Sequence, residues 1–327
     1  MTFSDEIYGK SKRYVSRDRL LTMLKHEYNL LEQRLGDADQ GKCFFAFANT
    51  VKTKPYQGPN DAHGSFGVRY QSTPDEQPNE IILHTRMWDD DNLKQQQAIG
   101  ILGTNLIYGA FYLKELPDQL IELLLDNLGL NRIEVDLIKF SGPDFEKTNN
   151  RIMNLLLVRK GAYANGSIFT RRQGRTGSQR FVQKAGLVER GSFRPVTKVN
   201  LDMLKCARAQ FIQEPALTGK DIIIMAEITI NNLLASGKID YEDFLHRIDS
   251  LATTGNYTLI SNYFEFYRLT QYFRRYTNET IGITMGINNL LEVFNEKYYA
   301  HPPSGILESF GRLFRNAVKL YIYPMKQ

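Results

Sequence analysis

The stretch LVERGSFRPVTKVNLDML, residues 187–204, joins a short apolar run to a helical pattern through a tight loop. The apolar residues before Gly191 predict the end of a buried strand, and Val199, Met203 and Ala207 recur at the spacing of a helix. A strand, a loop and a helix in this order leave the first N–H groups of the helix free to hold an anion. We therefore expect either a phosphate-binding turn or a turn with a structural role only.

Four residues of this turn are candidate phosphate ligands. Gly191 allows the backbone to come close to a ligand, and Ser192 begins the run of backbone N–H groups that would face it. Arg194 and Lys198 add positive charge at the same place. If the turn binds phosphate, these residues form its binding surface.

The turn resembles the signature of nucleotidyltransferases of the nicotinamide-mononucleotide adenylyltransferase type, which carry G-[ST]-F-x-P-x-[HT]-x-x-H at their first strand–helix turn. The matching positions are Gly191, Ser192, Phe193, Pro195 and Thr197. The last position is Asn200, where that family has a phosphate-binding histidine. The resemblance implies a nucleotide partner and catalytic roles for Thr197 and Asn200. The sequence leaves the cofactor open, with ATP and Mg²⁺ as the candidates. Asn200 would donate a hydrogen bond to a phosphoryl oxygen but carries no charge.

A wider resemblance covers most of the chain. Stretches such as NLIYGAFY, VDLIKFSGP and ILESFGRLF are similar to an uncharacterised bacterial family whose members often bear the label "TonB-dependent receptor". An outer-membrane barrel needs an export signal and many strands of alternating polarity. The N-terminal sequence lacks an apolar export segment, and the apolar runs do not alternate. We expect no receptor function from this label.

Strand and helix patterns alternate from residue 80 onward. Several of the predicted strands are continuously apolar, as in IIIMAEIT at 222–229, which is typical of parallel strands covered on both faces. The sequence therefore predicts an α/β fold with a mostly parallel, doubly wound sheet and helices on both faces. An eight-stranded β/α barrel is the alternative. Before residue 80, runs at 43–51 and 66–71 predict further strands, the second forming a hairpin with 80–87.

Positive charge is concentrated in one segment of the chain. Residues 171–194 hold seven basic side chains and one acidic one, although the net charge of the whole chain is only +5. The glycines and serine in RRQGRTGSQR predict a surface loop. We interpret 171–185 as a basic loop or linker between an α/β part at 1–170 and a second at 186–327, with one continuous domain as the alternative. The same loop could bind nucleic acid.

Composition and missing motifs narrow the function. The chain is 42% hydrophobic and 24% charged, as in soluble globular proteins, and has no apolar window of about 18 residues, so we expect a cytoplasmic protein and no membrane partner. Cys43 and Cys206 are far apart in sequence, which fits a reducing compartment. There is no P-loop, G-x-G-x-x-G or H-E-x-x-H motif, and the five histidines lack ligand spacing, so no metal site is predicted.

Several other residues are positional candidates. Asp89, Asp90 and Asp91 predict a helix start, or a Mg²⁺ site beside a nucleotide. The glycines of the following helix, Gly100 and Gly103, predict close approach of another backbone. Candidates at or near strand ends are Asp136, Glu227, Thr229, Ser261 and Asn262.

The sequence supports three functional hypotheses. The first is a nucleotide-binding protein with nucleotidyltransferase-like activity. The second is a non-catalytic interaction or scaffold protein, and the third is nucleic-acid binding through the basic loop. The substrate and the oligomeric state do not follow from the sequence.

Overall fold

The computed structural model of the chain describes residues 3–11, 13–36, 41–57, 60–129, 131–160, 166–169, 181–295, 305–315 and 317–324. The chain divides into two compact units, Met1–Ala164 (unit 1) and Asn165–Gln327 (unit 2). The division precedes the predicted linker at 171–185. The short strand Gly166–Phe169, which the sequence assigned to the first part, belongs to the sheet of unit 2. Residues 171–180 of the basic loop lie outside the described residues.

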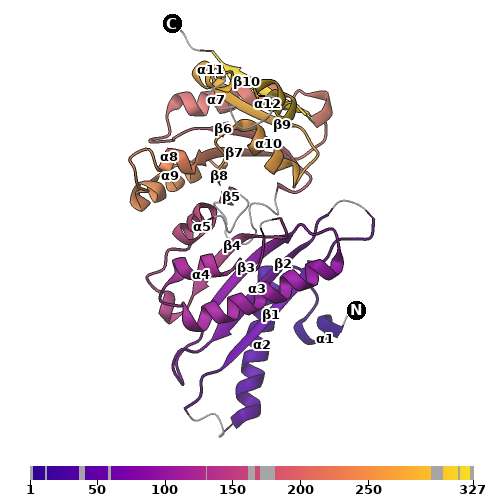
Figure 1. The fold of residues 1–327 in the computed structure, drawn as a ribbon, viewed down its shortest axis with the longest axis vertical. Helices are drawn as coiled ribbons and strands as arrows, with labels where there is room; N and C mark the ends of the chain where they lie inside the picture. The colour runs from indigo at the N-terminus through magenta and orange to yellow at the C-terminus, as the bar shows by residue number, and fades with distance from the viewer. Residues whose placement is uncertain are drawn as a thin grey trace. The chain divides into compact units, whose positions relative to one another are not determined.

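Unit 1 is built from one four-stranded sheet and the helices around it (Figure 1). Its strands are β1 (Phe45–Lys52), β2 (His63–Tyr70), β3 (Asn79–Met87) and β4 (Ile133–Ser141). Its helices are α1 (Phe3–Tyr8), α2 (Arg17–Leu35), α3 (Asn92–Tyr112), α4 (Pro117–Leu123), the 3-10 turn η2 (Pro143–Phe145) and α5 (Asn150–Arg159). Ser16 caps α2, because its Oγ accepts from Arg19 N at 3.2 Å.

The sheet of unit 1 is antiparallel throughout, in the order β1-β2-β3-β4, so the prediction of a mostly parallel sheet is wrong for this unit. Loops join β1 to β2 and β2 to β3 as neighbouring hairpins, which makes each pair antiparallel. Two helices, α3 and α4, lie between β3 and β4. Because a pair of helices returns the chain to the end where it started, Ile133 begins β4 opposite Met87, the last residue of β3.

The two faces of this sheet pack on different helices. Leu20, Leu24 and Tyr28 of α2 form a core cluster with alternate residues of β1, and a Cβ on Gly67 of β2 would meet the Leu24 side chain at 2.6 Å. On the other face, a Cβ on Gly103 of α3 would meet the Phe47 ring at 3.0 Å. The close neighbour of Gly103 is therefore a side chain, and not the backbone that was predicted. Alternation along β1 thus directs one set of side chains to α2 and the other to α3.

The outer edge of β4 is closed by two asparagines of α5. Asn154 Oδ1 accepts from Ile138 N at 3.1 Å and its Nδ2 donates to Ile138 O at 2.8 Å. Asn150 forms the same pair of bonds with the backbone of Phe140, at 2.7 and 2.9 Å. One helical turn advances about as far as two residues of a strand, so the two amides match alternate residues of β4. The side chains take the place of a fifth strand.

Unit 2 is built from a six-stranded sheet. Its strands are β5 (Gly166–Phe169), β6 (Ala185–Arg190), β7 (Ile222–Thr229), β8 (Tyr257–Ser261), β9 (Ile281–Gly286) and β10 (Val318–Tyr323). Its helices are α7 (Lys198–Phe211), the 3-10 turn η3 (Pro215–Leu217), α8 (Ile230–Leu233), α9 (Tyr241–Thr253), α10 (Phe266–Arg274), α11 (Ile287–Val293) and α12 (Gly305–Leu313). The predicted α/β class is confirmed.

The strand order of this sheet is β10-β9-β6-β7-β8-β5. The strands from β10 to β8 are parallel, and β5 is antiparallel to β8. Leu187 of β6 belongs to a cluster with Leu204 and Phe211 of α7. Its neighbour Gly186 lies against Phe181, whose ring contacts Phe273 of α10. Because successive strand residues point to opposite faces, α7 and α10 cover opposite faces of β6.

In the described part of the chain, no helix is long and apolar enough to cross a membrane.

Candidate functional site

The ends of four parallel strands meet at one edge of the unit 2 sheet. β6 ends at Arg190, β7 at Thr229, β8 at Ser261 and β9 at Gly286. The register places Arg190 beside Glu227 and Thr229 beside Ser261. This is the carboxyl edge of the parallel strands, where ligands of open α/β sheets bind. The predicted turn and most of the predicted strand-end candidates lie at this edge.

Glu227 is fully buried and bound on several sides. The guanidinium of Arg190 donates to both carboxylate oxygens, at 2.8 and 3.0 Å, and the Ser261 hydroxyl donates to Oε1 at 2.5 Å. Arg190 also donates to Phe264 O at 2.6 Å and lies over the Phe266 ring at 4.1 Å. Glu227 and Ser261 are therefore in contact, as both were predicted to lie at strand ends, but the Glu227 carboxylate is already paired with Arg190.

The loop after β6 is held by hydrogen bonds to other parts of unit 2. Gly191 N donates to Glu227 O at 3.0 Å, and Gly191 O accepts from Asn232 Nδ2 at 3.3 Å. Ser192 O accepts from a guanidinium nitrogen of Arg247 at 3.1 Å. Phe193 has a positive φ of 46° and is buried, with its ring packed against Gly191. The Gly191 amide, predicted to approach a ligand, is thus engaged by the protein's own backbone.

Thr197 and Asn200 form a capping box at the start of α7. Thr197 N donates to Asn200 Oδ1 at 3.0 Å, and Asn200 N donates to Thr197 Oγ1 at 3.2 Å. The remaining polar group of Asn200, Nδ2, donates to Glu189 Oε1 at 2.9 Å. The two predicted catalytic residues are therefore neighbours, but their bonds are with each other and with a buried carboxyl group.

Glu189 is a buried acid that the sequence did not single out. It lies one residue before the end of β6 and is only 1% exposed. Burial raises its pKa to about 7, and the hydrogen bond from Asn200 opposes this rise. No ion pair engages Glu189 among the described residues. The sequence signal that could have identified Glu189 is a single glutamate in an apolar run, because such a position predicts a buried carboxyl group. Burial without a cation raises the pKa of a carboxyl group.

The basic residues of the predicted anion-binding segment are largely neutralised where the structure describes them. Lys184 pairs with Asp221 at 2.8 Å, and Arg194 Nε pairs with Asp243 at 2.9 Å. With the pairing of Arg190 and Glu227, each of the three cations of this segment that lie in the described residues has a carboxylate partner. The linear charge count missed these partners because they come from β7, α9 and the loop before β7. Lys198, at the first position of α7, is exposed.

The aspartates at 89–91 serve structural roles. Asp91 caps α3, because its Oδ1 accepts from Lys94 N at 2.9 Å, which confirms the predicted helix start. Asp89 pairs with Arg132 and Asp90 with Lys54, each at 2.8 Å. Among the described residues, no group of three or more His, Cys, Asp or Glu side chains has the geometry of a metal site.

Another strand-end candidate in unit 2, Thr229, has a structural partner as well. Thr229 caps α8, with its Oγ1 accepting from Asn232 N at 3.1 Å. Most of the aromatic residues at 263–276 are buried: Tyr263, Tyr267, Tyr272, Phe273 and Tyr276. These side chains are part of the core of unit 2 and do not form an exposed stacking surface.

Unit 1 contains a polar cluster that sequence spacing did not predict. His63 and His84 lie on β2 and β3 with ring centroids 5.7 Å apart, and His84 Nδ1 hydrogen-bonds the Asp136 carboxylate. Arg86 lies 3.5 Å from Asp61, and burial lowers the pKa of His63. The strand predicted at 66–71 did not include His63, so the predicted hairpin did not bring the two histidines together. The His84 and Asp136 side chains are 4% and 0% exposed, so the cluster stabilises the sheet interior.

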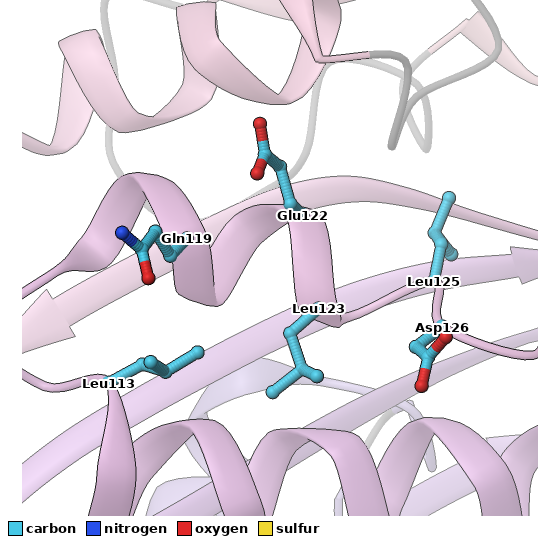
Figure 2. Close-up of a pocket in the computed structure, with 6 residues that line it drawn as sticks. All are labelled: Leu113, Gln119, Glu122, Leu123, Leu125 and Asp126. Carbon is cyan, nitrogen blue, oxygen red and sulfur yellow. The ribbon is translucent and has the colours of Figure 1, made fainter.

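A shallow depression lies at the end of α3 and beside α4, with a volume of about 490 Å³. It is lined by Leu113, Gln119, Glu122, Leu123, Leu125 and Asp126. Figure 2 shows the Leu113 and Leu123 side chains beside α3, and Glu122 pointing away from Leu123. Glu122 pairs with Lys160. None of the predicted site residues lines this depression.

Comparisons of the chain with protein-family models, with curated proteins and with solved structures found no match.

Proposed function

We propose that unit 2 binds a phosphate-bearing small molecule, of which a nucleotide is the first to test, at the carboxyl edge between β6 and β9. The observation that carries this proposal is the strand order. In the sheet, β7 and β8 follow β6 on one side. The next strands in the chain, β9 and β10, lie on the other side of β6. We infer a doubly wound sheet from this reversal. The loops after the two central strands of such a sheet diverge and leave a crevice for a ligand.

Two features at this position suit an anion. Lys198 is exposed at the start of α7, and no carboxylate among the described residues pairs with it. Ser192, in the loop after β6, is also exposed. A cation at the start of a helix adds to the positive end of the helix dipole, so the two together attract a phosphate group. Arg190 and Arg194 are not assigned this role, because each has a carboxylate partner.

The proposal is binding and not nucleotidyl transfer. Transfer would require Asn200 to donate to a phosphoryl oxygen, and its Nδ2 already donates to Glu189. Breaking that bond would leave the buried carboxyl group of Glu189 without its donor. We therefore expect a ligand to bind with no turnover.

The test is calorimetric titration of the full chain with ATP and with nicotinate mononucleotide, each with and without Mg²⁺. Lys198→Ala should weaken binding by about tenfold, the loss of one charge-assisted contact. Lys205→Ala is the matched control, because Lys205 is exposed on the same helix away from its start. No heat with either ligand at about millimolar concentration would contradict the proposal and favour a non-catalytic interaction protein.

A further inference from the structure

The two edges of the unit 1 sheet differ. The outer edge of β4 is closed by Asn150 and Asn154, but β1, at the other edge, pairs only with β2 among the described residues. β1 is eight residues long and its ladder with β2 is continuous, without a bulge. A long regular edge strand presents a row of unpaired N–H and C=O groups to another strand.

The register identifies the groups that point outward. Gln71 N donates to Phe44 O across the β1–β2 pair at 3.0 Å. In an antiparallel pair alternate residues point their backbone groups at the neighbouring strand, so the even-numbered residues of β1 face β2. The odd-numbered residues, Phe45, Phe47, Asn49 and Val51, therefore direct their backbone N–H and C=O groups away from the sheet.

The helix above this edge has an unusual solvent face. α3 carries one charged residue, Lys94, along its 21 residues. Four exposed residues of α3 form one stripe along the helix. Gly100, Thr104 and Phe111 follow Leu93 by about two, three and five helical turns, so all four residues face the same direction. Gly100 has nothing within 4 Å of the position of a Cβ, so the close approach predicted for it has no partner in the described chain.

The position of α3 fixes where this stripe points. The Phe111 ring contacts Phe45 of β1 and Tyr70 of β2, with centroids 5.4 and 5.5 Å apart. α3 therefore lies above the space between β1 and β2. Phe45 is 44% exposed, so the stripe ends beside an uncovered aromatic residue on the edge strand.

From these observations we infer that β1 pairs with β1 of a second copy of this chain, about a two-fold axis, and that the two α3 helices pack against each other above the joined strands. Strands in a sheet are about 4.8 Å apart. Two helices, each above the space between β1 and β2 of its own copy, would then lie about 10 Å apart. Packed helices are separated by about 8–10 Å, so strand pairing and helix packing are satisfied together.

The stripe is complementary to itself in this arrangement. Gly103 lies above Phe47, near the middle of β1, so the helices would cross near Gly100 and Thr104, where small side chains allow close approach. Leu93 of one copy would lie opposite Phe111 of the other. The face carries almost no charge, so like charges do not oppose each other along the stripe. An unrelated peptide strand could use the β1 edge but would leave the stripe uncovered.

The first test is sedimentation velocity on the full chain between about 1 and about 100 µM. A dimer of 37.7 kDa chains is expected, with slowed hydrogen exchange at the amides of Phe45, Phe47, Asn49 and Val51 as concentration rises. A monomer at every concentration would overturn the inference and leave a strand from a different protein as the occupant.

Two matched pairs of variants separate association from folding. Asn49→Pro removes an outward donor but no bond to β2, and Asn49→Ala keeps the donor. Gly100→Arg places bulk and charge at the helix crossing, whereas Gly100→Ala adds one methyl group in open space. Asn49→Pro and Gly100→Arg should each raise the dimer Kd by at least about tenfold, with Asn49→Ala close to wild type. Circular dichroism reports folding. If Asn49→Pro does not fold, the Gly100 pair decides, and an unchanged Kd in Gly100→Arg overturns the inference.

Discussion

Glu189 and Glu227 lie on adjacent strands of the unit 2 sheet, are both buried, and have opposite surroundings. Glu227 faces the side covered by α10 and is held by the fork of Arg190 and by Ser261. Glu189 faces the side covered by α7, where its hydrogen bond comes from the neutral amide of Asn200. Burial is almost equal at the two positions, so the two carboxyl groups differ in their partners and not in their depth: Glu227 is paired with a cation and Glu189 with a neutral amide.

The two carboxyl groups therefore give the carboxyl edge two different properties. A buried ion pair whose donors and acceptors are already bonded is a fixed part of the scaffold. A buried acid with one neutral partner can change protonation near neutral pH, and Glu189 has that property. Its contact with the capping box of α7 connects that protonation to the loop after β6.

The largest effect is expected from Arg190→Met. Removing the guanidinium leaves the buried Glu227 carboxylate without a cation, and the free energy of unfolding should fall by about 3–5 kcal/mol. Urea denaturation followed by circular dichroism measures the change. The double variant Arg190→Met/Glu227→Met should recover a large part of the loss, because no charge is then left buried. Equal losses in the single and double variants would show that the ion pair is not the cause.

Glu189→Gln should stabilise the protein at alkaline pH. The folded pKa of about 7 lies above the ordinary value of 4.5, so the wild type binds the proton more tightly when folded. The contribution of Glu189 to the free energy of unfolding is fully present below about pH 4.5 and is lost as pH rises through about 7. The glutamine variant lacks this loss, and the gain at about pH 8 should be on the order of 3 kcal/mol.

Thermal unfolding of the wild type and Glu189→Gln between about pH 4.5 and pH 8 measures this difference. The two curves should meet at the acid end and diverge toward the alkaline end. Parallel curves would mean that Glu189 titrates in the folded protein as it does in the unfolded chain.

The smallest effect is expected from Asn200→Ala, which loses the reciprocal hydrogen bond of the capping box, worth about 1 kcal/mol. Its distinguishing result is in the pH dependence. The Asn200 bond lowers the pKa of Glu189, so its loss should raise that pKa further and extend the loss of stability to higher pH. Thr197→Ala is the control, because it removes a cap hydrogen bond and leaves the Asn200 Nδ2 donor in place. Identical pH profiles for the two variants would separate Asn200 from Glu189.

Local signals in the sequence were read correctly, and nonlocal ones were not. Asp91 caps α3 as predicted, because a cap depends only on the next three residues. The hairpin predicted between 66–71 and 80–87 is confirmed by the antiparallel pairing of β2 and β3. The direction of β4 was missed, because the helices between β3 and β4 look locally like a parallel crossover. The direction of a strand depends on whether one helix or two connect it to the strand before. The spacing of apolar residues within each element carries no information on this.

The candidate site shows the same division. Glu227 and Ser261 were placed at strand ends from their position after apolar runs, and they do meet. That Arg190 binds Glu227 could not be predicted, because it requires β6 and β7 to be adjacent in a particular register. The contact between Asn200 and Glu189 could not be predicted either, because it joins a strand to the first turn of the next helix.

The asparagine bonds from α5 to β4 bear on how large an assembly of this protein can become. A sheet with two open edges can add copies without limit and grow into a fibre. Here Asn150 and Asn154 occupy the backbone groups of Ile138 and Phe140 on one edge, so strands can be added only at β1. Two copies joined at β1 would have a blocked edge at each end, so growth through this sheet stops at a closed pair.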